Sequence, residues 1–287
     1  MHEFNETLEQ ALARNVADAL MEDVGRGDWT ARLVPAGRRA HGHVLAKEGG
    51  VLCGHAWFEA CIRRLDLEAE VRWRVGEGEA FEPRTVVCEM AGNARALLSA
   101  ERAALNFLQM LSAVATVTRR YVKAIEGASP NPKGCRILDT RKTLPGLRQA
   151  QKHAVRVGGG ANQRLALWDG ILIKENHIAA AGGIAAVLGA AQELQAGVSI
   201  QIEVENLAEM DEALAAGAEN ILLDDFTLDD MREACARSAG RAVLEVSGGV
   251  DLDSVRAIAA TGVDRISIGK LTKDVQAIDF SWRLDAA

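Results

Sequence analysis

The sequence is poor in the residues that cross-link small secreted proteins. It has five cysteines in 287 residues, and no two of them form a CxxC pair. An odd number of cysteines without such a pair argues against a disulfide framework and against a zinc site. We therefore expect buried thiols in a reducing compartment. The cysteines are Cys53, Cys61, Cys88, Cys135 and Cys235.

Long apolar runs and an excess of positive charge are also missing. No window approaches the roughly 18 to 20 apolar residues of a membrane-spanning helix. The N-terminal segment MHEFNETLEQ is acidic and has no basic or apolar stretch typical of a secretion signal, so we expect a cytoplasmic protein. With 33 basic and 40 acidic residues the net charge is −7, which argues against general binding to nucleic acid or anionic membranes.

What is present is the composition of a folded protein. Hydrophobic residues make up 48% and charged residues 25% of the chain, which is ordinary for a globular protein with a full core. At roughly 150 residues per domain, the length suggests about two domains, either one large barrel or a barrel with a smaller partner.

The first part of the chain has mixed character. Apolar residues at helical spacing predict a helix over 5–22, which Gly25 and Gly27 end. Short strand-like runs occupy about 42–91 and are interrupted by a helical stretch near 55–66. A long helical segment at 95–126 is broken by the PNPKG run. These patterns predict a small α+β unit and a domain boundary near 115–130.

Strand-like and helical runs then alternate. The last four strand-like runs have their apolar ends near residues 203, 224, 246 and 268, which are 21 to 22 residues apart, about the length of one strand, one helix and two short loops. This period predicts a parallel (β/α) barrel. The six strand-like runs are RILDT (136–140), ILIKE (171–175), IQIEVE (200–205), NILLDD (220–225), AVLEVSG (242–248) and RISIG (265–269).

Ionisable and polar residues follow each of these later runs. In a parallel barrel the carboxyl ends of the strands meet at one rim, where active sites are assembled. Polar βα loops alone explain only part of this pattern, because paired carboxylates recur on adjacent strands. The residues are Lys174, Glu175, Glu203, Glu205, Asp224, Asp225, Ser247, Gly248, Gly249, Gly269 and Lys270.

Positive charge is concentrated in one segment. Residues 133–174 hold nine Lys or Arg and two acidic residues, whereas the rest of the chain has a net charge of −14. Such a segment suggests a receptor for a compact polyanion, a phosphate or a polycarboxylate. The alternative is a solvated helix face, which Arg148, Lys152 and Arg156 fit by their helical spacing.

Three motifs resemble those of one enzyme family. They are DTRKTLPGLR at 139–148, GGGANQR at 158–164 and LIKENHI at 172–178, with supporting pieces such as EVEN at 203–206 and EVSGGV at 245–250. Together they closely resemble the quinolinate phosphoribosyltransferases.

This resemblance implies an α/β fold, an open (β/α) barrel with an N-terminal α/β sandwich domain. It implies domains at 1–115, joined by the C-terminal segment 271–287, and at 116–270. The implied reaction joins quinolinate to phosphoribosyl pyrophosphate with Mg²⁺ and gives nicotinate mononucleotide, pyrophosphate and CO₂, a step of de novo NAD synthesis. No pyridoxal or thiamine cofactor is needed, because the pyridine ring itself accepts electrons. Family members are at least homodimers with shared active sites, and the choice between dimer and hexamer stays open.

The resemblance also assigns roles to residues. Arg141, Gln163, Arg164 and Lys174 are expected to bind the quinolinate carboxylates, with Arg102 from the neighbouring subunit. Lys142 is expected near the phosphates of the donor, and Glu203 and Asp224 near the ribose hydroxyls and Mg²⁺, directly or through water. The expected catalytic residues are Lys142, Lys174, Glu203 and Asp224. The candidates for the 5′-phosphate are Ser247, Gly248, Gly249 and Gly269.

Some residues depart from the family pattern, and two other functions stay open. Gln163 stands where many members have His, Asp225 where Asn is frequent, and Lys270 where a small residue is frequent. A first alternative takes Lys174 as the Schiff-base lysine of an aldolase or decarboxylase. A second takes the barrel as an anion-binding or regulatory protein without turnover.

Overall fold

The computed structural model describes residues 5–285 and divides into two compact units. The first unit contains the residues up to Arg119, Thr143–Gly159 and the residues from Thr272 onwards. The second contains Arg120–Lys142 and Gly160–Leu271. The predicted active-site residues other than Arg102 all belong to the second unit.

An antiparallel sheet forms one layer of the first unit. Its strand order is β12-β1-β5-β3, so the C-terminal strand pairs with the first strand of the chain. Burial alternates along the second half of β1, as expected for a sheet with one covered face. The four strands are β1 (Arg39–Ala46), β3 (Glu70–Trp73), β5 (Val86–Asn93) and β12 (Phe280–Leu284), while β2 (Gly50–Val51) and β4 (Ala80–Phe81) pair separately.

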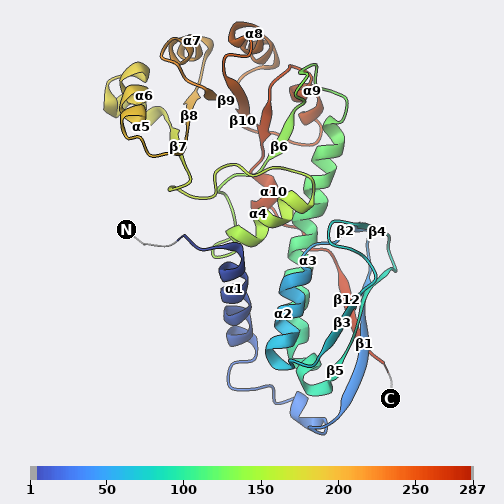
Figure 1. The fold of residues 1–287 in the computed structure, drawn as a ribbon. Coiled ribbons are helices and arrows are strands. Elements are labelled where there is room, and N and C mark those ends of the chain that lie inside the picture. The colour runs from blue at the N-terminus through green and yellow to red at the C-terminus, as the bar shows by residue number, and fades with distance from the viewer. Residues whose placement is uncertain (1–4, 286–287) are drawn as a thin grey trace. The chain divides into compact units, whose positions relative to one another are not determined.

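Helices cover that sheet. Phe58 on α2 packs its ring against Trp73 of β3 and Trp282 of β12, which places α2 on the buried face (Figure 1). A capping box between Thr7 and Gln10 begins α1. The helices are α1 (Leu8–Asp23), α2 (His55–Leu65), α3 (Ala94–Ile125), which continues into the second unit, and α4 (Arg148–Val157), together with the 3₁₀ turn Ala31–Leu33.

The alternative interpretation, in which the basic residues of α4 form one solvated face, is wrong. Lys152 is only 1% exposed, Arg148 is half-buried and Arg156 is exposed. The three cations therefore have different surroundings in spite of their regular spacing.

Six parallel strands form the sheet of the second unit. Their order is β6-β11-β10-β9-β8-β7, with β6 and β7 at the two edges, so the sheet is open. The middle residues of β9 and β10 are all buried, as expected for parallel strands covered on both faces. The strands are β6 (Arg136–Leu138), β7 (Gly170–Ile173), β8 (Ser199–Val204), β9 (Asn220–Asp224), β10 (Val243–Ser247) and β11 (Arg265–Ser267).

Helices follow the strands of this sheet, and Figure 1 shows α5 to α9 arranged around its outside. The expected α/β fold is confirmed. The structure has an antiparallel sheet domain formed largely by the N-terminal part of the chain and a parallel six-stranded sheet with helices. The helices are α5 (Glu175–Ala181), α6 (Ile184–Glu193), α7 (Leu207–Ala215), α8 (Leu228–Ser238), α9 (Val255–Ala259) and the short α10 (Lys270–Lys273).

The five cysteines carry free thiols. Cys53, Cys61 and Cys88 are buried as expected, but Cys135 and Cys235 are partly exposed. Within residues 5–285, none of the helices combines the length and apolar character needed to cross a bilayer.

Candidate active site

The parallel register brings most of the predicted residues to one edge of the six-stranded sheet. Glu203 is the penultimate residue of β8, whereas Asp224 and Ser247 end β9 and β10. Lys174 follows β7 directly and Gly269 comes shortly after β11. Because all neighbouring strands are parallel, these positions share the carboxyl edge.

Lys174 and Glu203 form an ion pair across the ends of β7 and β8. The Lys174 ammonium donates to both oxygens of the Glu203 carboxylate, at 2.9 and 2.7 Å. The Glu203 side chain is only 11% exposed, whereas that of Lys174 is 43% exposed. The lysine therefore compensates a carboxylate that is largely removed from water.

A second contact joins the ends of β9 and β10. The Ser247 hydroxyl donates to Asp224 Oδ1 at 2.6 Å, and the two residues are register partners in the parallel pair. The following turns are close together, because the Asp225 N–H donates to the Ser247 carbonyl at 3.2 Å. Gly248 has φ of +102°, and a Cβ there would lie 1.9 Å from Asp225 Oδ1. The positive φ favours glycine at this position, and any larger residue would require the Asp225 side chain to move.

The loop after β6 is tied to the GGGANQR segment. Asp139 is fully buried, and its carboxylate accepts hydrogen bonds from the Gln163 N–H at 3.0 Å and from the Asn162 side chain. Arg164 follows directly, and its guanidinium donates to the Gly170 carbonyl at 2.9 Å. Burial, together with the nearby Arg141 guanidinium, lowers the pKa of Arg164 below its usual value. The charge of Arg141 therefore acts on Arg164, and both guanidinium groups belong to the same part of the site.

The other predicted residues of the second unit lie in loops. Lys142 is exposed, and its backbone N–H donates to Thr140 Oγ1 at 3.1 Å. Gly249 is exposed with φ of +53°, and Gly269 is half-buried just before α10. His177 accepts a hydrogen bond at Nδ1 from the Lys174 N–H at 3.1 Å, so it orients the backbone at the lysine.

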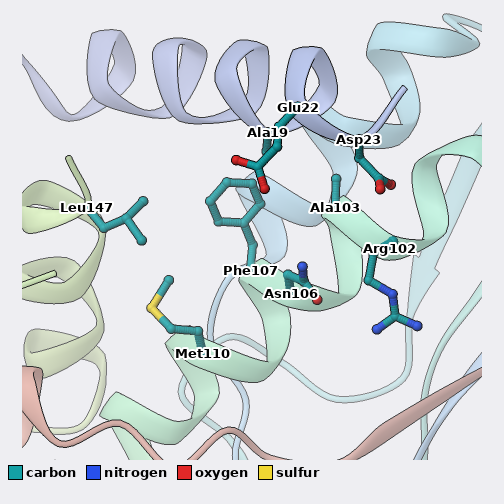
Figure 2. A pocket seen from close by; sticks show the side chains of 9 residues that line it. All are labelled: Ala19, Glu22, Asp23, Arg102, Ala103, Asn106, Phe107, Met110 and Leu147. Atoms are coloured by element: carbon teal, nitrogen blue, oxygen red, sulfur yellow. The ribbon is translucent and has the colours of Figure 1, made fainter. Parts of the chain in front are cut away.

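Arg102 lies in the first unit, on α3. It is exposed and borders a pocket of about 280 Å³ between α1, α3 and Leu147. Figure 2 shows Arg102 at the end of this pocket opposite Leu147, with Phe107 and Met110 between them.

Two residues that the sequence motifs did not indicate, Gln201 and Glu245, form hydrogen bonds that hold Gln163 in place. Gln163 Nε2 donates to Gln201 Oε1 at 2.7 Å, and Gln201 Nε2 donates to Glu245 Oε2 at 3.0 Å. Gln201 and Glu245 are 7% and 1% exposed. Both are polar residues inside apolar strand runs, and this is the signal that could have identified them, because a buried polar side chain needs a partner.

The carboxylates at this edge suit a hard divalent cation. Glu203 and Asp224 offer oxygen ligands from adjacent strands, the donor type that Mg²⁺ prefers. In residues 5–285, the only hydrogen bond of the Asp224 carboxylate is the one to Oδ1, so Oδ2 is available as a ligand. The donor set therefore fits Mg²⁺.

Comparison with known proteins gives consistent matches over nearly the whole chain. Residues 28–112 match the family described as quinolinate phosphoribosyl transferase, N-terminal domain, and residues 114–283 match its C-terminal domain. A protein from Synechocystis named probable nicotinate-nucleotide pyrophosphorylase (carboxylating) is 43% identical, over 86% of this chain and 84% of its own length. One from Mycobacterium leprae, named nicotinate-nucleotide pyrophosphorylase (carboxylating), is 39% identical over 93% of this chain and 94% of its own.

A solved structure is similar throughout. The nicotinate-nucleotide pyrophosphorylase from Francisella tularensis superposes with a TM-score of 0.92 at 41% identity, and 98% of each chain is covered.

Proposed function

This chain belongs to the quinolinate phosphoribosyltransferase family, and from that premise we propose that it is a carboxylating nicotinate-nucleotide pyrophosphorylase of NAD synthesis. It transfers the phosphoribosyl group of phosphoribosyl pyrophosphate to quinolinate and releases pyrophosphate and CO₂. The observation that carries the proposal is the gathering of cations and carboxylates at one sheet edge, with the Lys174–Glu203 pair as its best-defined contact.

The charge pattern suits two anionic substrates. Quinolinate is a dianion and the donor is more negative still, so holding both in one pocket requires cations that offset repulsion and desolvation. Arg141 and Arg164 offer two guanidinium groups, each of which matches the two oxygens of a carboxylate. We assign the quinolinate carboxylates to Arg141, Gln163, Arg164 and Lys174.

The donor occupies the other strand ends in this proposal. Lys142 binds its phosphates as a flexible point charge. The turn at Ser247, Gly248 and Gly249, together with Gly269, binds the 5′-phosphate, because glycine lets the backbone amides approach the oxygens closely. Glu203 and Asp224 face the ribose hydroxyls.

The reaction then needs little from the protein beyond placement and charge. The bond between ribose C1 and pyrophosphate breaks with its electron pair leaving on pyrophosphate, and the pyridine nitrogen forms the new bond to C1. Glu203 and Asp224 stabilise the positive charge that develops on the ribose. The carboxyl group next to the new pyridinium nitrogen leaves as CO₂, the ring holds the electron pair, and a proton replaces the carboxyl group.

Glu203 and Asp224 are also the residues that would hold Mg²⁺. When bound, the ion neutralises charge on the pyrophosphate.

We further propose a homodimer in which Arg102 reaches the active site of the neighbouring subunit. Two observations support this proposal. Arg102 is exposed, and several large apolar side chains of the same unit are exposed to solvent. Met21, Trp29 and Leu33 are 71%, 72% and 84% exposed. A second copy of the chain would cover them.

Domains at 1–115 with 271–287, and at 116–270, remain a proposal. Two observations support this division. One family match ends at residue 112 and the other begins at residue 114, and the C-terminal strand β12 pairs with β1. The cytoplasmic location also stays a prediction.

The test is CO₂ release from carboxyl-labelled quinolinate with and without phosphoribosyl pyrophosphate. Release should depend on the donor, and Lys174→Met should reduce kcat/KM about 100-fold or more because it removes charge stabilisation at the reacting centre. Lys47→Met, which removes an exposed lysine paired with Asp279, is the matched control and should keep full activity.

Two results would overturn the proposal. One is the absence of donor-dependent CO₂ release by the intact chain. The other is a covalent adduct on Lys174 after borohydride treatment with a keto acid, which would favour the Schiff-base enzyme.

A further inference from the structure

A second cluster of reactive side chains lies in the first unit. Cys53, Glu77 and His153 each offer one metal-ligating atom, and these atoms all lie within 4.8 Å of one another. His153 Nε2 is 3.2 Å from Glu77 Oε1. Cys53 is fully buried, whereas the His153 and Glu77 side chains are 24% and 29% exposed. The cluster thus has a thiol in the core and an opening to water.

Surrounding contacts hold these side chains in place. Glu77 accepts hydrogen bonds from the Gly54 N–H at 3.0 and 3.2 Å and from the His55 N–H at 3.1 Å, at the start of α2. The ring of His153 on α4 packs against Trp57, with 5.5 Å between ring centroids. The donor groups are therefore positioned by the fold rather than mobile on its surface.

We propose that Cys53, Glu77 and His153 form a binding site for Zn²⁺, with one coordination position open to solvent. Zinc bonds of about 2.0 Å to nitrogen or oxygen and about 2.3 Å to sulfur place tetrahedral ligands roughly 3.3 to 3.7 Å apart. The 3.2 Å between His153 Nε2 and Glu77 Oε1 already fits this range. The Cys53 sulfur lies within 4.8 Å of both ligand atoms, so binding would require it to move closer by about 1 Å at most. A thiol with an imidazole selects Zn²⁺ over Mg²⁺ or Ca²⁺, which prefer oxygen ligands.

A second imidazole lies beside the three ligands. His55 Nδ1 is 3.6 Å from Glu77 Oε2, and its ring stacks on Trp73. Its buried Nε2 lacks a hydrogen-bond partner among the described residues. His55 therefore lies where it can orient Glu77 as a ligand.

The ligands come from three separate segments of the first unit. Cys53 precedes α2, Glu77 lies between β3 and β4, and His153 is on α4, 76 positions after Glu77. For this reason the spacing of the cysteines could not indicate the site. Metal binding displaces the thiol proton of Cys53 and ties the three segments together, so Zn²⁺ should raise the melting temperature. The site is independent of the proposed enzymatic function.

The test uses the full-length chain after chelator treatment, titrated with Co²⁺ as a spectroscopic substitute for Zn²⁺. We expect one equivalent to give the near-ultraviolet thiolate-to-cobalt absorption and the visible absorption of tetrahedral cobalt, both abolished by Zn²⁺. Cys53→Ser and His153→Gln should each weaken binding by more than about 100-fold, since loss of a ligand exceeds loss of an outer partner. Cys235→Ser and His43→Gln, which remove a thiol and an imidazole elsewhere, should not change it.

The thiolate-to-cobalt absorption shows whether Cys53 is a metal ligand. Because the proposed Mg²⁺ ligands include no thiol, cobalt bound there gives no thiolate absorption. The proposal is wrong if the intact chain shows no thiolate absorption, or if the absorption persists in Cys53→Ser. Should Cys53→Ser fail to fold, unchanged Co²⁺ affinity in His153→Gln would overturn it alone, because His153 is partly exposed.

Discussion

At the residue scale, Glu245 has an unusual place for a carboxyl group. It lies in β10 at 1% exposure, and its Oε1 has no hydrogen-bond partner among residues 5–285. Burial raises the pKa of Glu245 above its usual value, although hydrogen bonds from Gln201 and Ser267 and the charge of Arg265 oppose this. Folding therefore favours the neutral form of Glu245 relative to the unfolded chain. Glu245 accepts a hydrogen bond from Gln201, which in turn accepts one from Gln163.

This predicts a particular dependence of stability on pH. A folded pKa above the unfolded value means that the contribution of Glu245 is fully present below the unfolded pKa of about 4.3 and is lost as pH rises through the folded value. Glu245→Gln removes that titration. We expect the stability of the wild type to fall relative to Glu245→Gln from about pH 4 upwards, as measured by denaturant unfolding at several pH values.

The exposed Glu193→Gln on α6 is the control, which should keep the pH dependence of the wild type. Parallel stability curves for the wild type and Glu245→Gln would contradict a folded pKa of Glu245 above its unfolded value.

Sequence motifs identify the residues at the ends of the strands better than the polar residues within the strands. Lys174, Glu203 and Asp224 stand out because ionisable residues interrupt apolar runs at a regular period. Gln201 and Glu245 lie inside such runs, and their partners are on other strands. Only the three-dimensional pairing shows that they form one hydrogen-bonded chain with Gln163.

At the element scale, the turns that follow β9 and β10 are fitted to each other. Asp225 has φ of +53° and its carboxylate fills the space beside Gly248. Gly248→Ala should displace Asp225 and the proposed phosphate-binding turn. Because a misplacement of about 1 Å can reduce a rate about 100-fold, we expect a loss of that order in kcat/KM, measured by CO₂ release.

Gly217→Ala is the matched control. Gly217 also has positive φ, at +81°, but a Cβ there meets no atom within 4 Å. This variant should show only backbone strain, about 1 kcal/mol of stability, with full activity. Equal activities of the two alanine variants would mean that the contact between Gly248 and Asp225 is unimportant for the reaction.

The elements differ in how well a local pattern predicts them. The six strands of the parallel sheet are short segments rich in Ile, Val and Leu that alternate with helical patterns, so their positions are predicted closely from the sequence. β4 is two residues long and exists only through its pairing with β2. β12 pairs with β1 from the opposite end of the chain, and no local pattern reveals so distant a partner.

At the scale of the whole molecule, the basic segment 133–174 is not one structural feature. Arg141, Lys142, Arg164 and Lys174 belong to the second unit, whereas Arg148, Lys152 and Arg156 lie on α4 in the first. A count of charges along the chain cannot make this distinction, because it depends on which unit each part of the segment joins. The prediction of a polyanion receptor therefore rests on the second-unit residues alone.

The proposed sharing of the active site between subunits is a property of the whole assembly. If Arg102 acts on the neighbouring subunit, an Arg102→Ala chain and a Lys174→Ala chain complement each other. The mixed dimer then has one complete site, because the intact Lys174 of one chain meets the intact Arg102 of the other. Coexpression with two affinity tags and sequential purification isolates this dimer, and its CO₂ release should be about half that of the wild type.

The reciprocal pairing supplies the control. A chain carrying both substitutions, combined with a wild-type chain, has no complete site if the sites are shared and one if they are not. Shared sites thus predict activity only in the first mixed dimer, and separate sites predict activity only in the second. Activity of the second dimer with an inactive first dimer would show that Arg102 serves its own subunit, and would leave the exposed Met21, Trp29 and Leu33 to some other contact.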